Sequence, residues 1–197
     1  MARKQGSHSE TTGPKVRESA LRLIARYGCA AVSMRKIAED VGVQVGALYN
    51  YTPDKQTLLF DLMRHHMENL LAAYAETPIE GTPVEQLEAF TRFHIRFHLP
   101  RRDEVFVSYM ELRNLSEENF AAIQDLRNNY EKALENILIA GEADGSFSFV
   151  DRKIAVLSVI AQLTGMTNWY RADGRLSQAE LEEAFCDLVL RAVSASR

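Results

Sequence analysis

Apolar residues recur along most of this chain with a spacing close to 3.6 residues, which predicts an all-α protein. The first repeat follows Pro14, a residue common at the start of a helix, and stops at Gly28. Two shorter repeats, in residues 33–41 and 45–49, flank Gly42, and helix, short glycine turn and helix together make a helix-turn-helix. The expected apolar face of the first helix consists of Val16, Ala20, Leu23, Ile24 and Tyr27.

Capping residues indicate where several helices begin. The Ser33 hydroxyl is suited to accept a hydrogen bond from a free N–H at a helix start. Thr52 and Pro53 match a cap followed by proline at the first helical position, so we predict a long helix over residues 53–76. Further helices, about nine in all, are expected over residues 84–98, 102–115, 117–139 and 151–170, and onward from a capping box at Ser177.

The last two predicted helices are apolar on more than one side, which leaves a surface for a second subunit. Four residues of the last helix follow one another at positions i, i+4, i+7 and i+11. We expect them to form a homodimer interface; the alternative is that both sides are buried within one subunit. These residues are Leu181, Phe185, Leu188 and Ala192.

Charge is distributed unevenly along the chain. The net charge is −4, yet residues 1–57 carry 9 Lys and Arg against 5 Asp and Glu, whereas residues 58–197 carry 14 against 22. A basic N-terminal part on an acidic protein favours contact with phosphates there. Because we find no apolar run that spans a membrane, no apolar leader, and no metal-ligand spacing at Cys29 or Cys186, we expect a cytoplasmic protein without a membrane partner.

A helix-turn-helix places its second helix in the major groove of DNA, where the first residues of that helix reach the bases. Gln44 is suited to pair with adenine, and the small Gly46 allows a close approach. Tyrosine hydroxyls and a lysine that follow are suited to bind phosphates. An antiparallel helix pair in an all-helical core is the alternative. The predicted DNA-binding residues are Ser33, Met34, Arg35, Gln44, Val45, Gly46, Ala47, Tyr49, Tyr51 and Lys55.

Residues 15–59 resemble the DNA-binding domain of the tetracycline-repressor (TetR) family. The resemblance implies a DNA-binding domain at residues 14–57 and a helical effector-binding and dimerisation domain at residues 58–197, after a disordered tail at residues 1–13. It also implies a repressor that binds a palindromic operator, with its last two helices paired to those of a second subunit in a four-helix bundle. The matching segments are SALRLIARYG, SMRKIAEDVGV, GALYNY and PDKQTLL.

Two positions depart from the pattern of that family. Val45 stands where many relatives carry lysine or another polar residue, so we expect an apolar contact in the groove, such as one with a thymine methyl group. Thr52 stands where an aromatic residue is usual. We therefore expect the packing between the recognition helix and the next helix to differ.

Aromatic residues of several predicted helices are expected to surround one interior, where with a few polar groups they wall a pocket. Ordinary core packing is the alternative for each of them. The strings NWYRADGRLS and ELEEAFCDLVLRA resemble a subgroup of TetR-family repressors that controls fatty-acid or steroid breakdown, which implies a small hydrophobic effector such as an acyl-CoA. The predicted effector-binding residues are Phe90, Phe93, His94, Phe97, Tyr109, Arg113, Tyr130, Asn168 and Trp169.

Two histidines raise the possibility of other chemistry. His94 and His98 stand at i and i+4, a spacing that can hold a metal together with Glu104 or Glu111. A helical hydrolase built on His94, His98 and Glu111, and a plain dimeric interaction module, are the alternatives to a regulator. Because His94 lies among phenylalanines and no nucleophile motif or phosphate loop is present, we expect no enzyme, no metal and no cofactor.

Overall fold

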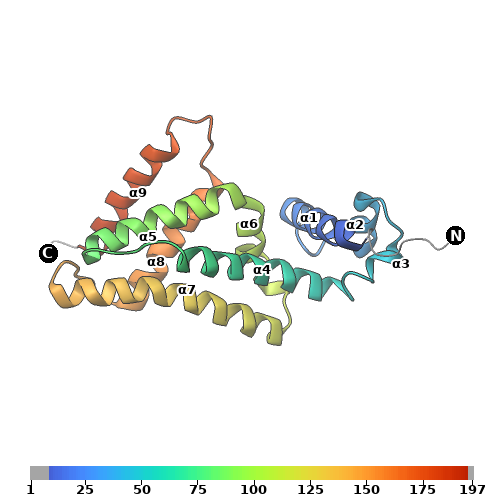
Figure 1. Ribbon diagram of the computed structural model, residues 1–197, viewed down its shortest axis with the longest axis horizontal. Helices are drawn as coiled ribbons and strands as arrows, with labels where there is room; N and C mark the ends of the chain where they lie inside the picture. Colours follow the sequence, from blue (N-terminus) through green and yellow to red (C-terminus); the bar gives the residue numbers. More distant parts are fainter. Residues whose placement is uncertain (1–8, 195–197) are drawn as a thin grey trace. The chain divides into compact units, whose positions relative to one another are not determined.

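The computed structural model describes residues 9–194, with their side chains from residue 12 onward. The predicted all-α class is confirmed, because this part of the chain forms α-helices and short 3-10 helices and contains no named strand (Figure 1). An isolated parallel bridge joins Ser148 and Ser194. None of the described helices is long and apolar enough to cross a membrane.

The predicted helices are present, with several ends shifted. Three of them are continued or followed by a 3-10 helix, where the backbone tightens. The elements are α1 (Ser9–Tyr27), α2 (Met34–Val41), α3 (Val45–Leu48), α4 (Lys55–Ala75), α5 (Pro83–His98), η1 (Leu99–Arg101), α6 (Arg102–Met110), η2 (Leu112–Asn114), α7 (Glu117–Asp144), α8 (Arg152–Gly165), η3 (Met166–Asn168) and α9 (Gln178–Val193).

Helix α1 begins at Ser9, five residues before the predicted start at Pro14. Pro14 lies inside this helix, in its second turn, so its missing N–H costs one intrahelical hydrogen bond, while its fixed φ suits a helix. Residues 9–13 of the predicted tail are thus helical, while residues 1–8 lie outside the described residues.

Helix α4 begins at Lys55 rather than at Pro53. Asp54 caps it, since its Oδ1 accepts a hydrogen bond from the Thr57 N–H at 2.7 Å, and this bond lowers the pKa of the Asp54 carboxyl. Thr52, the predicted cap, is buried instead and donates its hydroxyl to the Asp54 carbonyl at 3.0 Å. Thr52 and Asp54 are both residue types that cap helices. Because Thr52 is buried and bonds the Asp54 carbonyl, Asp54 is the cap.

The predicted ends of three later helices also move. Helix α6 stops at Met110 and α8 at Gly165, and 3-10 helices follow both. Helix α7 instead continues to Asp144, where Gly145 takes a left-handed conformation (φ 82°) that ends the helix. Apolar spacing alone does not separate an α-helical turn from a 3-10 turn, so these differences concern ends rather than elements.

The chain divides into two compact units. The first contains residues up to Met67 together with Asp103–Gln124, and the second contains Glu68–Arg102 together with the chain from Asp125 onward. This division differs from the predicted boundary after residue 57, because α6 and the start of α7 belong with the helix-turn-helix. Helices α4 and α7 each contribute residues to both units.

Hydrogen bonds explain why the later segment belongs to the first unit. The Gln56 amide donates to the Asn114 carbonyl at 2.6 Å and accepts from the Ser116 N–H at 3.0 Å. Glu111, almost fully buried, accepts from the Asn114 side chain at 2.5 Å, and its Oε1 lies close to Gly28. The segment after α6 therefore packs against both the start of α4 and the end of α1.

The core of the first unit follows the predicted apolar face of α1 with one exception. Val16, Ala20, Leu23 and Ile24 are all buried. Tyr27, the fifth predicted member, is 45% exposed. Its position at the last residue of α1 places it beyond the packed part of the face.

The second unit is built around α5, which packs against α8 and α9 (Figure 1). Both α5 and α9 begin with a capping box, Thr82 with Glu85 and the predicted Ser177 with Glu180. The Ser177 N–H donates to the Glu180 carboxylate at 2.8 Å, and this bond lowers the pKa of Glu180. These caps define where the two packed helices begin.

Candidate DNA-binding and effector sites

The second helix of the helix-turn-helix, α3, is a single turn long. Gln44 precedes it and its side chain makes no capping bond. Leu48 is fully buried, whereas Val45 and Tyr49 are 41% and 51% exposed. One apolar anchor, Leu48, thus holds α3. Of the predicted DNA-binding residues around it, Gln44 and Gly46 are exposed, and Ala47 and Tyr51 are half-buried.

Helix α2 forms as the sequence predicts. The Ser33 hydroxyl accepts from the Lys36 N–H at 3.2 Å, and Gly42 takes a left-handed φ of 78°. Arg35 is highly exposed and pairs with Glu39 at 3.1 Å, one turn away, while Met34 is half-buried. Arg35 stands in the first turn of α2, and its exposed ion pair is one that water and salt weaken.

An ion pair locks α1 to α2. Arg22 donates to the Asp40 carboxylate, which also accepts from the Ser19 hydroxyl at 2.6 Å. The hydrogen bond from Arg22 and then that from Ser19 hold the pKa of Asp40 below its usual value. The carboxylate therefore stays ionised and both bonds persist near neutral pH.

A cationic cluster beside α2 was not predicted from the sequence. The Lys36 ammonium lies 3.7 Å from the centre of the exposed Tyr27 ring, and the Arg26 guanidinium lies 5.2 Å from it. Such cation–π contacts hold positive charge at the surface of the first unit without neutralising it. Their only sequence signal is a tyrosine at the end of an apolar face next to basic residues.

Lys55 ties the start of α4 to the connection between α1 and α2. Its ammonium donates to the Cys29 carbonyl at 2.9 Å and to the Val32 carbonyl at 3.1 Å. Because an ammonium has three donors, one remains for a phosphate. The residue predicted to bind DNA thus also has an internal structural contact.

The predicted effector-binding residues do not all belong to one unit. Tyr109, half-buried on α6, and Arg113, exposed on η2, lie in the first unit. The remaining seven lie in the second unit, where five of them are linked by ring contacts. Phe90, His94 and Tyr130 meet directly, and Phe93 joins them through Tyr74 and stacks on Phe97.

Tyr74, which the sequence analysis missed, lies at the centre of this aromatic cluster. Its ring makes edge contacts with Phe90 at 5.7 Å, Phe93 at 5.3 Å and Tyr130 at 5.8 Å between ring centres. Phe90 and Tyr130 stack at 5.2 Å. Burial raises the pKa of the Tyr74 phenol, so its hydroxyl stays neutral. Tyr74 lies within the helix predicted over residues 53–76, but only the packing reveals its contacts.

Polar groups gather at one side of the aromatic cluster. His94 is fully buried, with Nδ1 3.1 Å from the Tyr130 hydroxyl and Nε2 3.3 Å from the Thr164 hydroxyl. His98 stacks on His94 at 4.0 Å and its Nδ1 bonds the His94 carbonyl at 2.9 Å. Burial lowers the pKa of His98 to about 4, so this imidazole is neutral at physiological pH.

Two other predicted effector-binding residues lie at the surface of the second unit. Trp169 is 56% exposed and stacks on Phe185 at 6.2 Å, and Asn168 is exposed. Arg102 donates to the Tyr170 carbonyl and so fixes the backbone that carries Trp169. The indole is therefore available at the surface rather than inside the aromatic cluster.

The predicted subunit interface divides into buried and exposed residues. Leu181 and Phe185 are 1% and 5% exposed, so they belong to the core of the protomer and have almost no surface left for a partner. Leu188 and Ala192 are exposed. Periodicity placed all four on one stripe, but α5 and α8 cover the first part of it.

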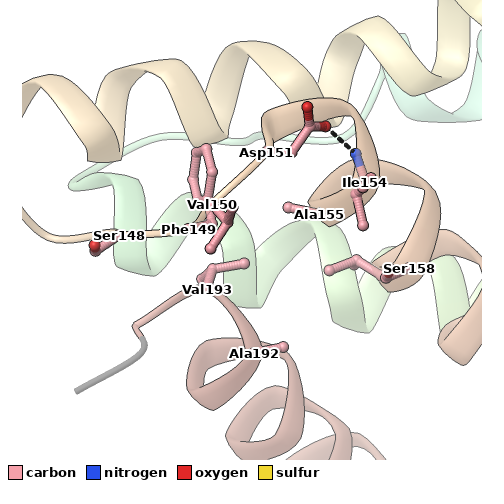
Figure 2. Close-up of a pocket in the computed structure, with 10 residues that line it drawn as sticks. Ser148, Phe149, Val150, Asp151, Ile154, Ala155, Ser158, Ala192 and Val193 are labelled. Carbon is pink, nitrogen blue, oxygen red and sulfur yellow. Dashed lines mark hydrogen bonds between the residues drawn. The ribbon is translucent and has the colours of Figure 1, made fainter. Parts of the chain in front are cut away.

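Helix α8 adds an exposed apolar face of its own. Ile154 is 65% and Leu157 45% exposed, and Val150, before the helix, is 99% exposed. A cavity of about 420 Å³ opens between this segment and Ala192 (Figure 2). The exposed apolar face therefore combines α8, the segment before it and the end of α9.

The described residues contain no group of three His, Cys, Asp or Glu side chains that could hold a metal ion. Glu111 belongs to the first unit and the two histidines to the second, and both ring nitrogens of His94 face protein hydroxyls. Cys186 is buried, which raises the pKa of its thiol to about 11. None of these groups is arranged as an activated nucleophile or metal ligand.

A helix-turn-helix unit joined to a larger helical unit defines a DNA-binding transcriptional regulator. The family described as tetracyclin repressor-like, C-terminal domain, matches residues 80–193, and the family described as bacterial regulatory proteins, tetR family, matches residues 16–62. The chain belongs to the TetR family. The resemblance seen in the sequence is confirmed.

Several characterised proteins are similar to the chain over most of its length. The HTH-type transcriptional repressor KstR2 of Rhodococcus jostii is 25% identical over 174 residues, which are 87% of this chain and 85% of the relative. The fatty acid metabolism regulator protein of Bacillus subtilis is 23% identical over 179 residues, 89% of this chain and 92% of the relative. A solved structure of AibR in complex with isovaleryl coenzyme A and operator DNA is 25% identical, with a TM-score of 0.80, and covers 93% of this chain and 98% of that one.

The exposed amide of Gln44 predicts a loss of base selectivity in Gln44→Ala. We expect discrimination at one base position to fall by about 1–3 kcal/mol, because a bidentate contact to adenine is lost. Fluorescence anisotropy with an operator selected from random DNA, and with its single-base variants, measures this. Gln178→Ala, which removes an amide from α9, is the control; unchanged selectivity in Gln44→Ala removes this residue from the base-reading surface.

The contacts of Lys55 predict a different phenotype for Lys55→Met. Two carbonyls lose a charged donor, so we expect the free energy of unfolding to fall by about 1–3 kcal/mol. DNA affinity should fall for all sequences alike, with base preference retained. Urea unfolding together with anisotropy measures both effects. The control is Lys132→Met, at an exposed position, which should leave stability and DNA affinity unchanged. Full stability in Lys55→Met would show that the two hydrogen bonds of Lys55 do not stabilise the fold.

Proposed function

We propose that this regulator is a homodimeric repressor that an acyl-CoA thioester releases from its operator. The observation that carries the proposal is the aromatic interior of the second unit, where Tyr74, Phe90 and Tyr130 meet. Such walls suit an aliphatic chain, and the hydroxyls and imidazole around His94 suit a thioester carbonyl. The similar AibR was solved in complex with isovaleryl coenzyme A, which supports this ligand class, and a similar Bacillus protein regulates fatty acid metabolism.

We assign DNA recognition to the exposed surface of α3 and the start of α2. Gln44, Val45 and Gly46 would meet base edges, and Tyr49 would bind a phosphate. The unpaired positive charge near Tyr27 supports this assignment, because phosphate contacts supply much of DNA affinity. Two subunits would place their α3 helices in successive major grooves, about 34–36 Å apart.

We assign the subunit interface to the exposed apolar face of α8 and α9. Leu157, Ile154 and Leu188 are large, apolar and about half exposed or more, which is unusual for a surface without a partner. Their helices pack against each other within the protomer. Pairing them with the same two helices of a second copy forms a four-helix bundle and buries these side chains.

Helix α4 gives the proposal its mechanism. It runs without interruption from Lys55, which contacts the connection between α1 and α2, to the region of Tyr74 in the aromatic cluster. A ligand that displaces the Tyr74 end would move a rigid element that also contacts the DNA-binding unit. The effector shifts the equilibrium only by its difference in affinity for the two states.

No catalytic step is assigned to this chain. Both nitrogens of His94 face protein hydroxyls, and the neutral His98 is almost fully buried. Acyl-CoA would therefore bind as an effector and leave unchanged. Incubation of the protein with an acyl-CoA, followed by chromatography, tests this: release of free CoA at a rate that depends on His94 would overturn it.

Disruption of the apolar face should separate the subunits. Leu188→Glu would bury an uncompensated charge in each half of the interface, at a cost of several kcal/mol. Sedimentation velocity should then show monomers, and operator affinity should collapse because the two half-sites are no longer linked. Ile139→Glu, an equally exposed apolar position on α7, is the control. A tight dimer in Leu188→Glu would place the interface elsewhere.

A titration tests the effector and its coupling to DNA. Lauroyl-CoA should weaken operator binding of the wild type about 5- to 150-fold, and operator should weaken lauroyl-CoA binding by the same factor. Phe90→Ala should reduce the response, because it opens the buried aromatic wall. Operator affinity that no acyl-CoA changes would exclude acyl-CoA release. AibR was captured with ligand and DNA together, so both affinities must be measured.

A further inference from the structure

An unassigned groove lies on the surface of the second unit beside α5. Its volume is about 500 Å³, which is within the usual size of small-molecule sites. Three arginines and two phenylalanines dominate its lining, and Thr77 borders it from the segment after α4. We call it the arginine groove and define it by Arg92, Phe93, Arg96, Phe97 and Arg101.

Helical spacing brings these side chains together. Arg92 and Arg96 stand at i and i+4 on α5, and Phe93 and Phe97 form a second row beside them. The two phenyl rings stack with centres 5.9 Å apart. The Arg101 guanidinium, from η1, lies 4.1 Å from the centre of the Phe97 ring. The groove thus presents the half-buried Phe93 ring and a row of guanidinium groups, while Phe97 is almost fully buried beside Arg101.

The arginines of α5 are oriented by carboxylates from outside the groove lining. Arg92 donates to Glu183 at 2.9 Å and lies 3.7 Å from Glu88. Arg96 donates twice to the nearly buried Glu182, at 2.9 and 2.7 Å. These bonds fix the guanidinium planes and use only part of their donors, since each guanidinium has five.

Arg101 is different from the other two. It donates to the Phe97 carbonyl at 2.8 Å, and no carboxylate of the described residues pairs with it. Its positive charge is therefore not neutralised within this part of the chain. Arginine pairs with phosphate through parallel hydrogen bonds and stacks well on planar rings. A ligand that carries both phosphates and a planar base matches the groove.

The groove also borders the aromatic cluster. Phe93 belongs to the groove and contacts Tyr74 at 5.3 Å between ring centres, and Tyr74 contacts Phe90 and Tyr130. A ligand whose charged aromatic end lies in the groove would therefore have its other end next to these rings. Coenzyme A thioesters have this chemical form, with a phosphorylated adenosine at one end and an acyl chain at the other.

We infer that the arginine groove binds the phosphorylated adenosine of the effector, with Arg101 as its main phosphate ligand and the half-buried Phe93 ring as the apolar surface for adenine. The inference rests on the proposed function, because it assigns one end of the proposed effector. It predicts that the protein binds lauroyl-CoA more tightly than lauroyl-pantetheine, which lacks the nucleotide. It also predicts that salt weakens only the binding of lauroyl-CoA.

Isothermal titration calorimetry on Arg101→Ala tests the assignment. Lauroyl-CoA affinity should fall about ten- to a hundredfold, because charged hydrogen bonds to phosphate are lost, and lauroyl-pantetheine affinity should stay as in the wild type. Because no carboxylate of residues 12–194 pairs with Arg101, the variant leaves none of them unpaired and should fold. Arg152→Ala, which removes one positive charge and one surface ion pair with Glu142 from the same unit, should bind both ligands normally.

The possible failures are separable. If the wild type prefers lauroyl-CoA but Arg101→Ala keeps that preference, the groove assignment is wrong and the proposed function stands. If the wild type binds neither ligand, the proposed function is wrong. In that case the groove assignment is tested by titrating adenosine 3′,5′-bisphosphate, the nucleotide of coenzyme A. Salt-sensitive binding that Arg101→Ala abolishes supports the groove assignment, and absence of binding overturns it.

Discussion

The two hydrogen bonds from the Lys55 ammonium to the Cys29 and Val32 carbonyls set the geometry of the DNA-binding unit. Helix α3 is one turn long and has a single buried anchor, Leu48, so it cannot hold its own position. Its direction depends on the elements on either side, α2 and the start of α4. Lys55 joins the start of α4 to the connection between α1 and α2. The Arg22–Asp40 pair joins α2 to α1. The short helix α3 is thereby supported by contacts of α1, α2 and α4.

Helix α5 has the corresponding role in the second unit. One side of it contributes Phe90 and His94 to the buried aromatic cluster, where both ring nitrogens of His94 face hydroxyl groups. Another side carries Arg92 and Arg96, which pair with carboxylates of α9. Packing against α8 and α9 also buries the inner stripe of α9 and leaves the exposed apolar face free for a second subunit. The α5 part of the aromatic cluster and the exposed apolar face are thus built on the same three packed helices.

Much of this organisation follows from local patterns. Apolar spacing identified the helices, and the capping residues Ser33, Gly42 and Ser177 act as predicted, because a cap satisfies free backbone groups of its own helix and needs no distant partner. The family resemblance also located the helix-turn-helix, because its matching segments are short and continuous in the sequence. Of the predicted effector-binding residues, Phe90 and His94 on α5 and Tyr130 on α7 came together, since each is buried on the inner face of its own helix.

Tertiary structure decided what local patterns leave open. A periodic stripe shows which face of a helix is apolar, but not whether the surface that covers this face belongs to the same chain or to a second subunit. Only the packing separates the buried Leu181 and Phe185 from the exposed Leu188. The internal bonds of Lys55 likewise depend on residues distant in sequence, Cys29 and Val32. The choice of Asp54 over Thr52 as a cap goes with the burial of Thr52 in the folded unit. The sequence by itself determined the helices, their caps and the family. The contacts between helices determined the surfaces available to DNA, effector and partner.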